Sequence, residues 1–154
     1  MSWLRYIAIF CITAINFQSF AQTKDWTFTI TNNDQQHTWL LEYTALYLCF
    51  NADNCEKISH SFDALKGNTL IKPGATQTLT VPLSSDVQVD PQTTNWHINA
   101  IAYWEESGEL KQKICFLDYK QDGVQWLPTI DHPDPVKTGC EVTGPMENVK
   151  VVLH

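Results

Sequence analysis

The sequence has few basic residues and no long apolar run. Lysine and arginine number 10 against 17 aspartates and glutamates in 154 residues, and the formal net charge at neutral pH is −7. This balance argues against sequence-independent binding to DNA or RNA, which depends on basic side chains that contact phosphates. It also disfavours adhesion to an anionic membrane by charge alone. The longest apolar stretch, residues 6–17, is about a dozen residues, whereas a membrane-spanning helix needs about 20.

Spacing motifs of common enzymes and metal sites are missing as well. Although five histidines and five cysteines are present, no Cys-x-x-Cys, His-x-x-x-His or Glu-x-x-His pattern occurs. Gly-x-Ser-x-Gly, which marks a nucleophilic serine, and the Asp-x-Asp-x-Asp-Gly calcium loop are also lacking. The leading interpretation is therefore a protein with no catalytic residues, no cofactor and no metal ion.

The N-terminus has the organisation of a signal peptide. A single positive charge, Arg5, precedes the apolar run 6–17, and the small residues Ser19 and Ala21 stand at positions −3 and −1 of a cleavage site. We predict a signal peptide over residues 1–21. The protein is then secreted or periplasmic, with no stable membrane insertion after cleavage.

The expected mature chain, residues 22–154, has the length of one domain and keeps an even number of cysteines. These are Cys49, Cys55, Cys115 and Cys140. In an exported protein an even count favours two disulfides. We favour Cys49 with Cys55, which closes a short loop, and Cys115 with Cys140, which ties a proline-rich segment to a strand. The main alternative joins Cys49 to Cys115 and Cys55 to Cys140.

Alternation of large apolar and polar residues recurs along the chain and predicts β-strands. The segments with this pattern are 26–31, 39–50, 77–83, 95–104, 110–119 and 148–153. A helix is the alternative for 39–50, but the aromatic content favours a strand whose odd positions, from Trp39 to Cys49, face the core. Pro82 marks 77–83 as an edge strand, because proline cannot donate a ladder hydrogen bond.

Turn-forming residues separate these segments. Residues 73–74, Pro-Gly, predict a turn, and residues 105–109 predict the tip of a β-hairpin. Residues 51–68, 84–94 and 121–145 are predicted as loops. About six to eight short strands without a sustained helical pattern predict an all-β, mostly antiparallel fold, namely a small disulfide-stapled β-sandwich.

Three clusters contain residue types that occur in active or metal sites. They are Ser59-His60-Ser61 with Asp63, Glu105-Glu106 with Glu109, and the acids Asp118, Asp122, Asp131, Asp134 and Glu141. The first has the groups of a nucleophilic triad, the second could pair carboxylates for glycoside hydrolysis, and the third could offer oxygens to calcium. A polar loop, a solvated hairpin tip and an acidic loop explain them without chemistry. A metal-binding protein or small hydrolase is therefore the third interpretation.

Aromatic residues in or beside predicted loops are better candidates for binding. Trp26, Trp39 and Trp96 fall on apolar strand faces and are expected in the core. The remaining candidates are Trp104, Trp126, Tyr103 and Tyr119, together with the loop acid Asp131. Because flat aromatic surfaces suit sugar rings and protein hot spots, we predict a non-enzymatic recognition module for a protein or carbohydrate partner. The alternative is a structural or assembly subunit of an extracytoplasmic complex, joined by strand addition through residues 148–153.

Overall fold

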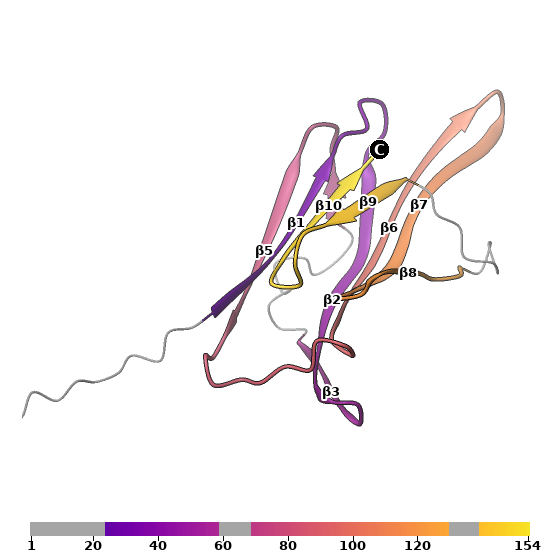
Figure 1. The fold of residues 1–154 in the computed structure, drawn as a ribbon. Coiled ribbons are helices and arrows are strands. Elements are labelled where there is room, and N and C mark those ends of the chain that lie inside the picture. Colours follow the sequence, from indigo (N-terminus) through magenta and orange to yellow (C-terminus); the bar gives the residue numbers. More distant parts are fainter. Residues whose placement is uncertain (1–23, 59–68, 130–138) are drawn as a thin grey trace, which may run out of the picture.

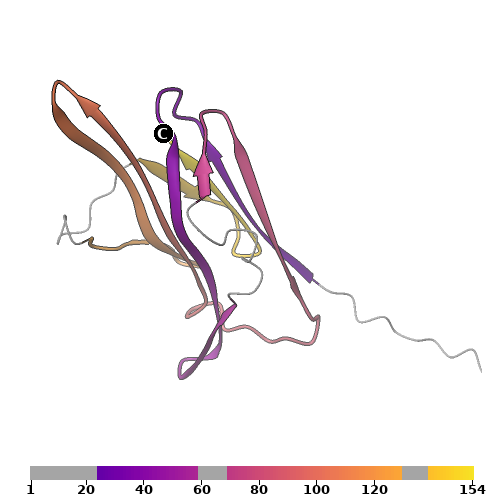
Figure 2. The same cartoon turned by 180° about the vertical axis from the view of Figure 1, so that it is seen from behind.

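The computed structural model describes residues 24–58, 69–129 and 139–154. Within these ranges, ten strands form two sheets that lie face to face (Figures 1 and 2). The strands are β1 (Lys24–Asn32), β2 (Trp39–Asn51), β3 (Asn54–Ile58), β4 (Thr69–Ile71), β5 (Thr76–Leu83), β6 (Asn95–Glu106), β7 (Glu109–Lys120), β8 (Gly123–Trp126), β9 (Cys140–Thr143) and β10 (Asn148–Leu153). No helix among the described residues is long and apolar enough to cross a membrane.

The first sheet has the strand order β5-β1-β10-β9, and the second has the order β3-β2-β6-β7-β8 with β4 also paired to β2. The pairing is antiparallel except between β1 and β10, which run parallel. The hairpin of β6 and β7 extends beyond the rest of the second sheet, as Figure 1 and Figure 2 both show. The predicted disulfide-stapled, mostly antiparallel β-sandwich is confirmed.

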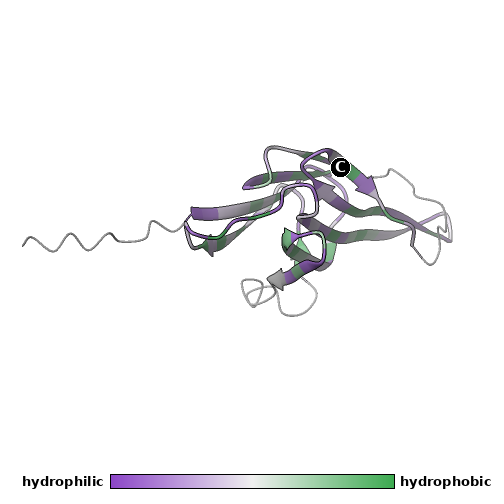
Figure 3. Ribbon diagram, turned by 60° about the horizontal axis from the view of Figure 1, so that its bottom comes forward, coloured by the Kyte–Doolittle hydropathy of each residue, from purple (hydrophilic) through white to green (hydrophobic). Residues whose placement is uncertain are grey.

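One apolar core fills the space between the sheets. Phe28 of the first sheet packs against Trp96 of the second, with ring centroids 5.2 Å apart, and neither residue is exposed. Trp39 is also fully buried, and Trp26 is 7% exposed, so the three tryptophans expected in the core do lie there. Burial of each such side chain contributes on the order of 1.5–3 kcal/mol to folding. The alternation of apolar and polar positions that directs these side chains inward is visible along the strands in Figure 3.

The prediction that all odd positions of β2 share one buried face is correct only for the residues before Glu42. The pairing with β6 shifts between Leu41 and Tyr43, because one extra residue, Glu42, forms a β-bulge. Such a bulge exchanges the two faces of a strand, since side chains alternate with a period of two. Leu46 therefore points into the core and is fully buried, whereas Tyr47 lies on the outer face of the second sheet.

Four short strands escaped the sequence prediction, so the count of six to eight strands was too low. β3 falls in the segment predicted as loop 51–68, and β4 follows directly after that segment. β8 and β9 fall in the predicted loop 121–145. Each has only three to five residues, too few for a clear alternation. These short strands form because neighbouring strands supply their hydrogen-bond partners. Their own residues do not indicate this long-range pairing.

Two disulfides staple the fold in the pairing favoured from the sequence. Cys49 is bonded to Cys55 across β2 and β3, and Cys115 of β7 is bonded to Cys140 of β9. The second bond links the two sheets, because β7 and β9 belong to different sheets. The predicted turn at Pro73-Gly74 and the predicted edge position of β5 are also found.

Candidate functional site

A cavity of about 510 Å³ lies at the end of the sandwich where β1 begins and β5 ends. Its walls come from β1, the end of β5, the segment from Ser84 to Thr94, the end of β7 with the following turn, and the turn between β9 and β10. We call the segment from Ser84 to Thr94 the cavity loop and the hollow the end cavity. Volumes of a few hundred cubic ångströms are usual for ligand pockets, typically about 300–1,000 Å³.

The lining of the end cavity combines apolar and polar residues, and its buried part is mainly apolar. Its apolar members are Trp26, Leu83, Val87, Val89, Pro91, Pro145 and Met146. Its main polar members are Lys24, Ser84, Ser85, Tyr119, Gln121 and Glu147. Four lining residues are buried, namely Trp26, Leu83, Met146 and the polar Thr94. The exposed members include Lys24, Ser84, Ser85 and Gln121 and the apolar Pro91 and Pro145. The arrangement suits a group with an apolar body and a polar end.

One cation and one anion stand at the rim of the end cavity. Lys24 Nζ lies 3.9 Å from Glu147 Oε1, and both side chains are largely exposed to water. An exposed pair at this distance contributes little to stability, typically well under 1 kcal/mol. Both charges are therefore available to a ligand at small energetic cost.

The turn between β9 and β10 is fixed in place by backbone geometry and by two aromatic side chains. Gly144 has a φ of 95°, and a Cβ at this position would collide with the carbonyl oxygen of Asn148. The hydroxyl of Tyr119 donates a hydrogen bond to the Gly144 carbonyl oxygen. The indole N–H of Trp96 donates to the Met146 carbonyl oxygen at 2.9 Å. This wall of the end cavity is thus held to the second sheet.

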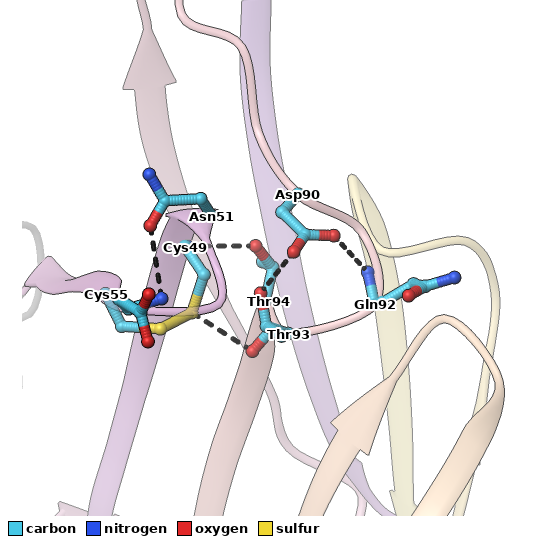
Figure 4. The surroundings of a disulfide bond; sticks show 8 residues. Cys49, Asn51, Cys55, Asp90, Gln92, Thr93 and Thr94 are labelled. Atoms are coloured by element: carbon cyan, nitrogen blue, oxygen red, sulfur yellow. Dashed lines mark hydrogen bonds between the residues drawn. A yellow bond between two sulfur atoms is a disulfide. The ribbon is translucent and has the colours of Figure 1, made fainter.

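The cavity loop is held by the end of β2 that carries the first disulfide (Figure 4). The backbone N–H of Cys49 donates to Thr94 Oγ1 at 3.0 Å, and the backbone N–H of Asp90 donates to the Cys49 carbonyl oxygen. Cys49 Sγ lies 3.1 Å from the Thr93 carbonyl oxygen. The Asp90 carboxylate in turn accepts hydrogen bonds from the Gln92 N–H and the Thr93 hydroxyl. One residue, Cys49, therefore contacts three residues of the loop, Asp90, Thr93 and Thr94.

The two disulfides differ in their exposure to solvent. Cys55 is an exposed residue, whereas its partner Cys49 is 1% exposed. Cys115 and Cys140 are 0% and 2% exposed. Only the first disulfide presents a sulfur-bearing residue at the surface.

The opposite end of the sandwich carries a polar cluster around Asp34. Its Oδ2 lies 2.8 Å from His37 Nδ1 and 3.0 Å from Lys113 Nζ, and its Oδ1 accepts the backbone N–H groups of Gln36 and His37. Burial alone would raise the pKa of Asp34, but these hydrogen bonds outweigh it and hold the pKa well below its usual range. His37 also stacks against Trp104, with ring centroids 4.2 Å apart. All these groups are satisfied by one another, which is the pattern of a structural cluster.

A second cluster lies on the outer face of the second sheet. His97 Nδ1 lies 2.9 Å from Asp118 Oδ1, and the imidazole meets the rings of Tyr43, Tyr47 and Phe116 edge-on, with centroids 5.3, 6.5 and 5.6 Å away. The bulge in β2 brings both tyrosines to this face. The cluster has an imidazole and a carboxylate, but no serine or cysteine is among its contacts within the described residues.

The aromatic residues predicted to form one binding surface are not brought together. Trp104 packs against His37 near the Asp34 cluster, and Tyr103 is 47% exposed on the outer face of the second sheet. Trp126 and Tyr119 are partly buried against the core. Of these four aromatic residues, Tyr119 lines the end cavity and the other three do not. Asp131 lies outside the described residues.

The other candidates from the sequence gain no site within the part of the chain that the structure describes. Ser59 to Asp63, Asp131 and Asp134 fall outside it. No group of three or more histidine, cysteine, aspartate or glutamate side chains that could hold a metal ion occurs in it. Glu105, Glu106 and Glu109 are exposed beside the β6–β7 turn. The end cavity itself could not be found from the sequence, because segments far apart in the chain form its walls.

Comparison of the chain with protein-family models, with curated proteins and with solved structures gave no match. The geometry of the described residues is therefore the basis for a functional proposal. The end cavity is the strongest candidate, since it combines a partly open space with a mainly apolar buried lining and available charges.

Proposed function

We propose that this protein is a non-enzymatic recognition module that holds an apolar group of a partner in the end cavity. The single observation that carries the proposal is the cavity of about 510 Å³ whose buried lining is mainly apolar, with Thr94 as its buried polar member, and whose rim carries Lys24 and Glu147. Apolar pockets with a few convergent polar groups are the usual form of a binding site. Export by a signal peptide to a secreted or periplasmic location is part of the proposal, and the two disulfides are compatible with an oxidising compartment.

The lining favours a protein partner over a carbohydrate among the two expected from the sequence. A sugar presents many hydroxyls, and each buried hydroxyl without a hydrogen-bond partner costs about 1–3 kcal/mol. Among the buried lining residues, Leu83 and Met146 offer no such partner, and Trp26 and Thr94 offer one indole N–H and one hydroxyl, fewer groups than the hydroxyls of a sugar. An aliphatic or aromatic side chain on a peptide segment matches this interior, while Lys24 and Glu147 are placed to contact the polar backbone or flanking charges of the segment.

The alternative of a subunit assembled through its last strand has less support. β10 lies between β1 and β9 and is paired with both of them. Within the described residues it therefore has no open edge to offer to another chain, and strand addition through β10 would first require one of these pairings to break.

The proposal is tested by filling the end cavity. Val87→Trp places a large side chain in the lining, and Gln88→Trp is the matched control because Gln88 is an exposed neighbour that does not line the cavity. The probe is 1-anilinonaphthalene-8-sulfonate, an apolar aromatic body with an anionic end. We expect saturable one-to-one binding to the wild type and to Gln88→Trp, detected by fluorescence and by amide NMR shifts at the lining residues.

Val87→Trp should weaken probe binding by about tenfold or more, which corresponds to about 1.4 kcal/mol. Near-ultraviolet circular dichroism must show that both variants keep their tertiary packing. Equal binding by the two variants, or NMR shifts located away from the end cavity, would falsify the proposal. The same titration with apolar N-acetylated amino-acid amides and with simple sugars then separates a peptide-binding site from a carbohydrate-binding site.

A further inference from the structure

The two cysteines of the first disulfide differ in exposure. Cys55 and Cys49 face each other in the antiparallel pairing of β2 and β3, but Cys55 is exposed while Cys49 is 1% exposed. A thiolate attacks a disulfide at one sulfur, and access decides which sulfur is attacked. Attack from solvent is therefore directed to Cys55, with Cys49 as the leaving group.

The second disulfide serves as an internal reference for this comparison. Cys115 and Cys140 are both buried in the core cluster, and their bond joins the two sheets. A thiol can reach it only after the sandwich opens. Exposed disulfides are the labile ones, whereas buried structural disulfides resist exchange.

We propose that the Cys49–Cys55 disulfide is a thiol-exchange site for a dithiol reductant and that its reduction loosens the cavity loop. The first thiolate of the dithiol forms a bond to Cys55 Sγ, the Cys49–Cys55 bond breaks, and the electron pair leaves on Cys49, which takes up a proton. The second thiol then attacks its own partner sulfur in the mixed disulfide and releases Cys55 as a thiolate, which is protonated from water. The dithiol is oxidised to its disulfide, and two electrons and two protons are transferred to the cysteine pair.

The environment of Cys49 accommodates the reduced state. Its Sγ already lies 3.1 Å from the Thr93 carbonyl oxygen, where a thiol can donate a hydrogen bond. The fold does not depend on this bond for its long-range connections, because Cys49 and Cys55 are only six residues apart in sequence. Opening such a short loop returns less chain entropy to the unfolded state than opening the loop of 25 residues between Cys115 and Cys140.

Reduction affects the end cavity through Cys49. This residue donates to Thr94 Oγ1, accepts from the Asp90 N–H and packs its sulfur against Thr93 (Figure 4). The disulfide holds β3 beside this end of β2, so its loss gives the β2 terminus more freedom and weakens the three contacts. The cavity loop supplies one wall of the end cavity, so reduction of the disulfide should change the binding site. This last consequence rests on the proposed function, whereas the exchange itself does not.

The exchange itself is tested by partial reduction of the full mature protein under native conditions with dithiothreitol. Free thiols are alkylated at intervals, and peptide mass spectrometry reports which cysteines have been released. We expect Cys49 and Cys55 to be alkylated at least tenfold faster than Cys115 and Cys140, while near-ultraviolet circular dichroism stays native. Equal rates, or earlier release of Cys115 and Cys140, would overturn the exchange site.

The coupling is tested by amide hydrogen exchange in the partly reduced protein and in the double variant Cys49→Ala with Cys55→Ala. Faster exchange in the cavity loop, with unchanged exchange in β1 and β10, supports the coupling, and an unchanged loop contradicts it. Thr94→Val keeps the disulfide but removes the hydroxyl that accepts from Cys49, so it should reproduce part of the loop effect without changing which disulfide opens first.

Titration with 1-anilinonaphthalene-8-sulfonate separates this inference from the proposed function. Binding that is weakened severalfold on reduction supports both. If the oxidised protein does not bind the probe while Cys49 and Cys55 are still released first and the cavity loop exchanges faster, the proposed function fails and the exchange site stands. If the oxidised protein binds but reduction leaves the affinity unchanged, the control of binding by reduction is wrong.

Discussion

Tyr43 and Tyr47 lean toward each other along β2, so that their hydroxyl oxygens lie 3.4 Å apart on the outer face of the second sheet. Between them on the same face is Ala45, which is fully buried although it points away from the core. The bulge at Glu42 creates this relationship, because without it both tyrosines would point toward the first sheet. His97 fills the remaining space beside the two rings.

This pair predicts an alkaline transition. The hydrogen bond with Tyr43, together with burial and nearby negative charge, raises the pKa of Tyr47 to about 12. The ordinary value is about 10, so the folded state holds the phenolic proton more tightly than the unfolded state. The resulting contribution to stability is complete below pH 10 and is lost as the pH rises from about 10 through 12.

The measurement is the ultraviolet absorbance of tyrosinate as a function of pH, paired with unfolding at each pH. Tyr43→Phe removes the hydrogen-bond partner, so the pKa of Tyr47 should fall toward 10. Tyr103→Phe is the control, because Tyr103 is 47% exposed and distant in the pairing register. A late-titrating tyrosine that persists in Tyr47→Phe would show that the shift has been assigned to the wrong residue.

The sequence predicts those features that repeat locally. Alternation identified β1, β5, β6 and β10 and the inward face of each, and the Pro-Gly and Ser-Gly pairs identified the turns at residues 73–74 and 107–108. The favoured disulfide pairing, which closes a short loop and ties a proline-rich segment to a strand, agrees with the structure. The strands and turns depend on the residues of one segment, which is why they could be inferred without the partner strands.

Features that depend on contacts between distant segments could not be inferred. The bulge at Glu42 leaves the composition of β2 unchanged, so strict alternation placed Tyr47 in the core and Leu46 outside. Asp34 stands in a stretch that reads only as a turn, and its partner Lys113 is 79 residues away. The sequence likewise could not place Trp104 and Trp126 relative to each other: Trp104 pairs with Lys111, whereas Trp126 pairs with Leu117 farther along β7.

The bulge predicts opposite results for two leucines that strict alternation would treat alike. Leu46 is fully buried between the sheets, whereas Leu40 lies on the outer face ahead of the bulge and is half-buried. Leu46→Ala should lower the free energy of unfolding by about 2–5 kcal/mol, the usual cost for a core leucine. Leu40→Ala should cost about 1 kcal/mol or less, since most surface substitutions have small effects. Urea denaturation of both variants decides the matter, and equal losses would contradict the bulge.

The Asp34 cluster predicts a loss of stability on removal of one charge. Asp34→Asn keeps an oxygen for the backbone N–H groups but leaves Lys113 and His37 without their carboxylate. Removing one partner of a buried ion pair lowers the free energy of unfolding by about 3–5 kcal/mol. Because Lys113 is partly exposed, we expect a loss of about 2–3 kcal/mol. Asp25→Asn, an exposed aspartate on β1, is the control and should change little.

The same cluster predicts a specific response to acid. Because the pKa of Asp34 is lowered in the folded state, its contribution to stability is present above the ordinary carboxyl pKa of about 3.9 and is lost as the pH falls below it. Wild type and Asp34→Asn should therefore converge in stability toward low pH. A constant difference between their unfolding free energies from neutral to acidic pH would show that the Asp34 charge contributes nothing.

Two glycines test whether the turn between β9 and β10 shapes the end cavity. Gly144 and Gly74 both have positive φ, 95° and 75°, but a Cβ at Gly74 meets no atom within 4 Å, whereas one at Gly144 collides with the Asn148 carbonyl oxygen. Gly74→Ala should cost about 1–2 kcal/mol from backbone strain alone. Gly144→Ala should cost more, because the Asn148 carbonyl must also move.

Displacement of the turn by Gly144→Ala should also change the shape of the end cavity. The Gly144 carbonyl oxygen accepts a hydrogen bond from the Tyr119 hydroxyl, and Gly144 lines the cavity beside Met146. Gly144→Ala should weaken binding of 1-anilinonaphthalene-8-sulfonate severalfold, whereas Gly74→Ala, whose turn lies outside the cavity lining, should leave the affinity unchanged. Binding is measured well below the unfolding temperature of each variant, so that a difference reports on the wall and not on the folded fraction. If Gly144→Ala destabilises the protein but binds the probe with wild-type affinity, the turn supports the fold without shaping the cavity, and the wall that matters for binding is the cavity loop.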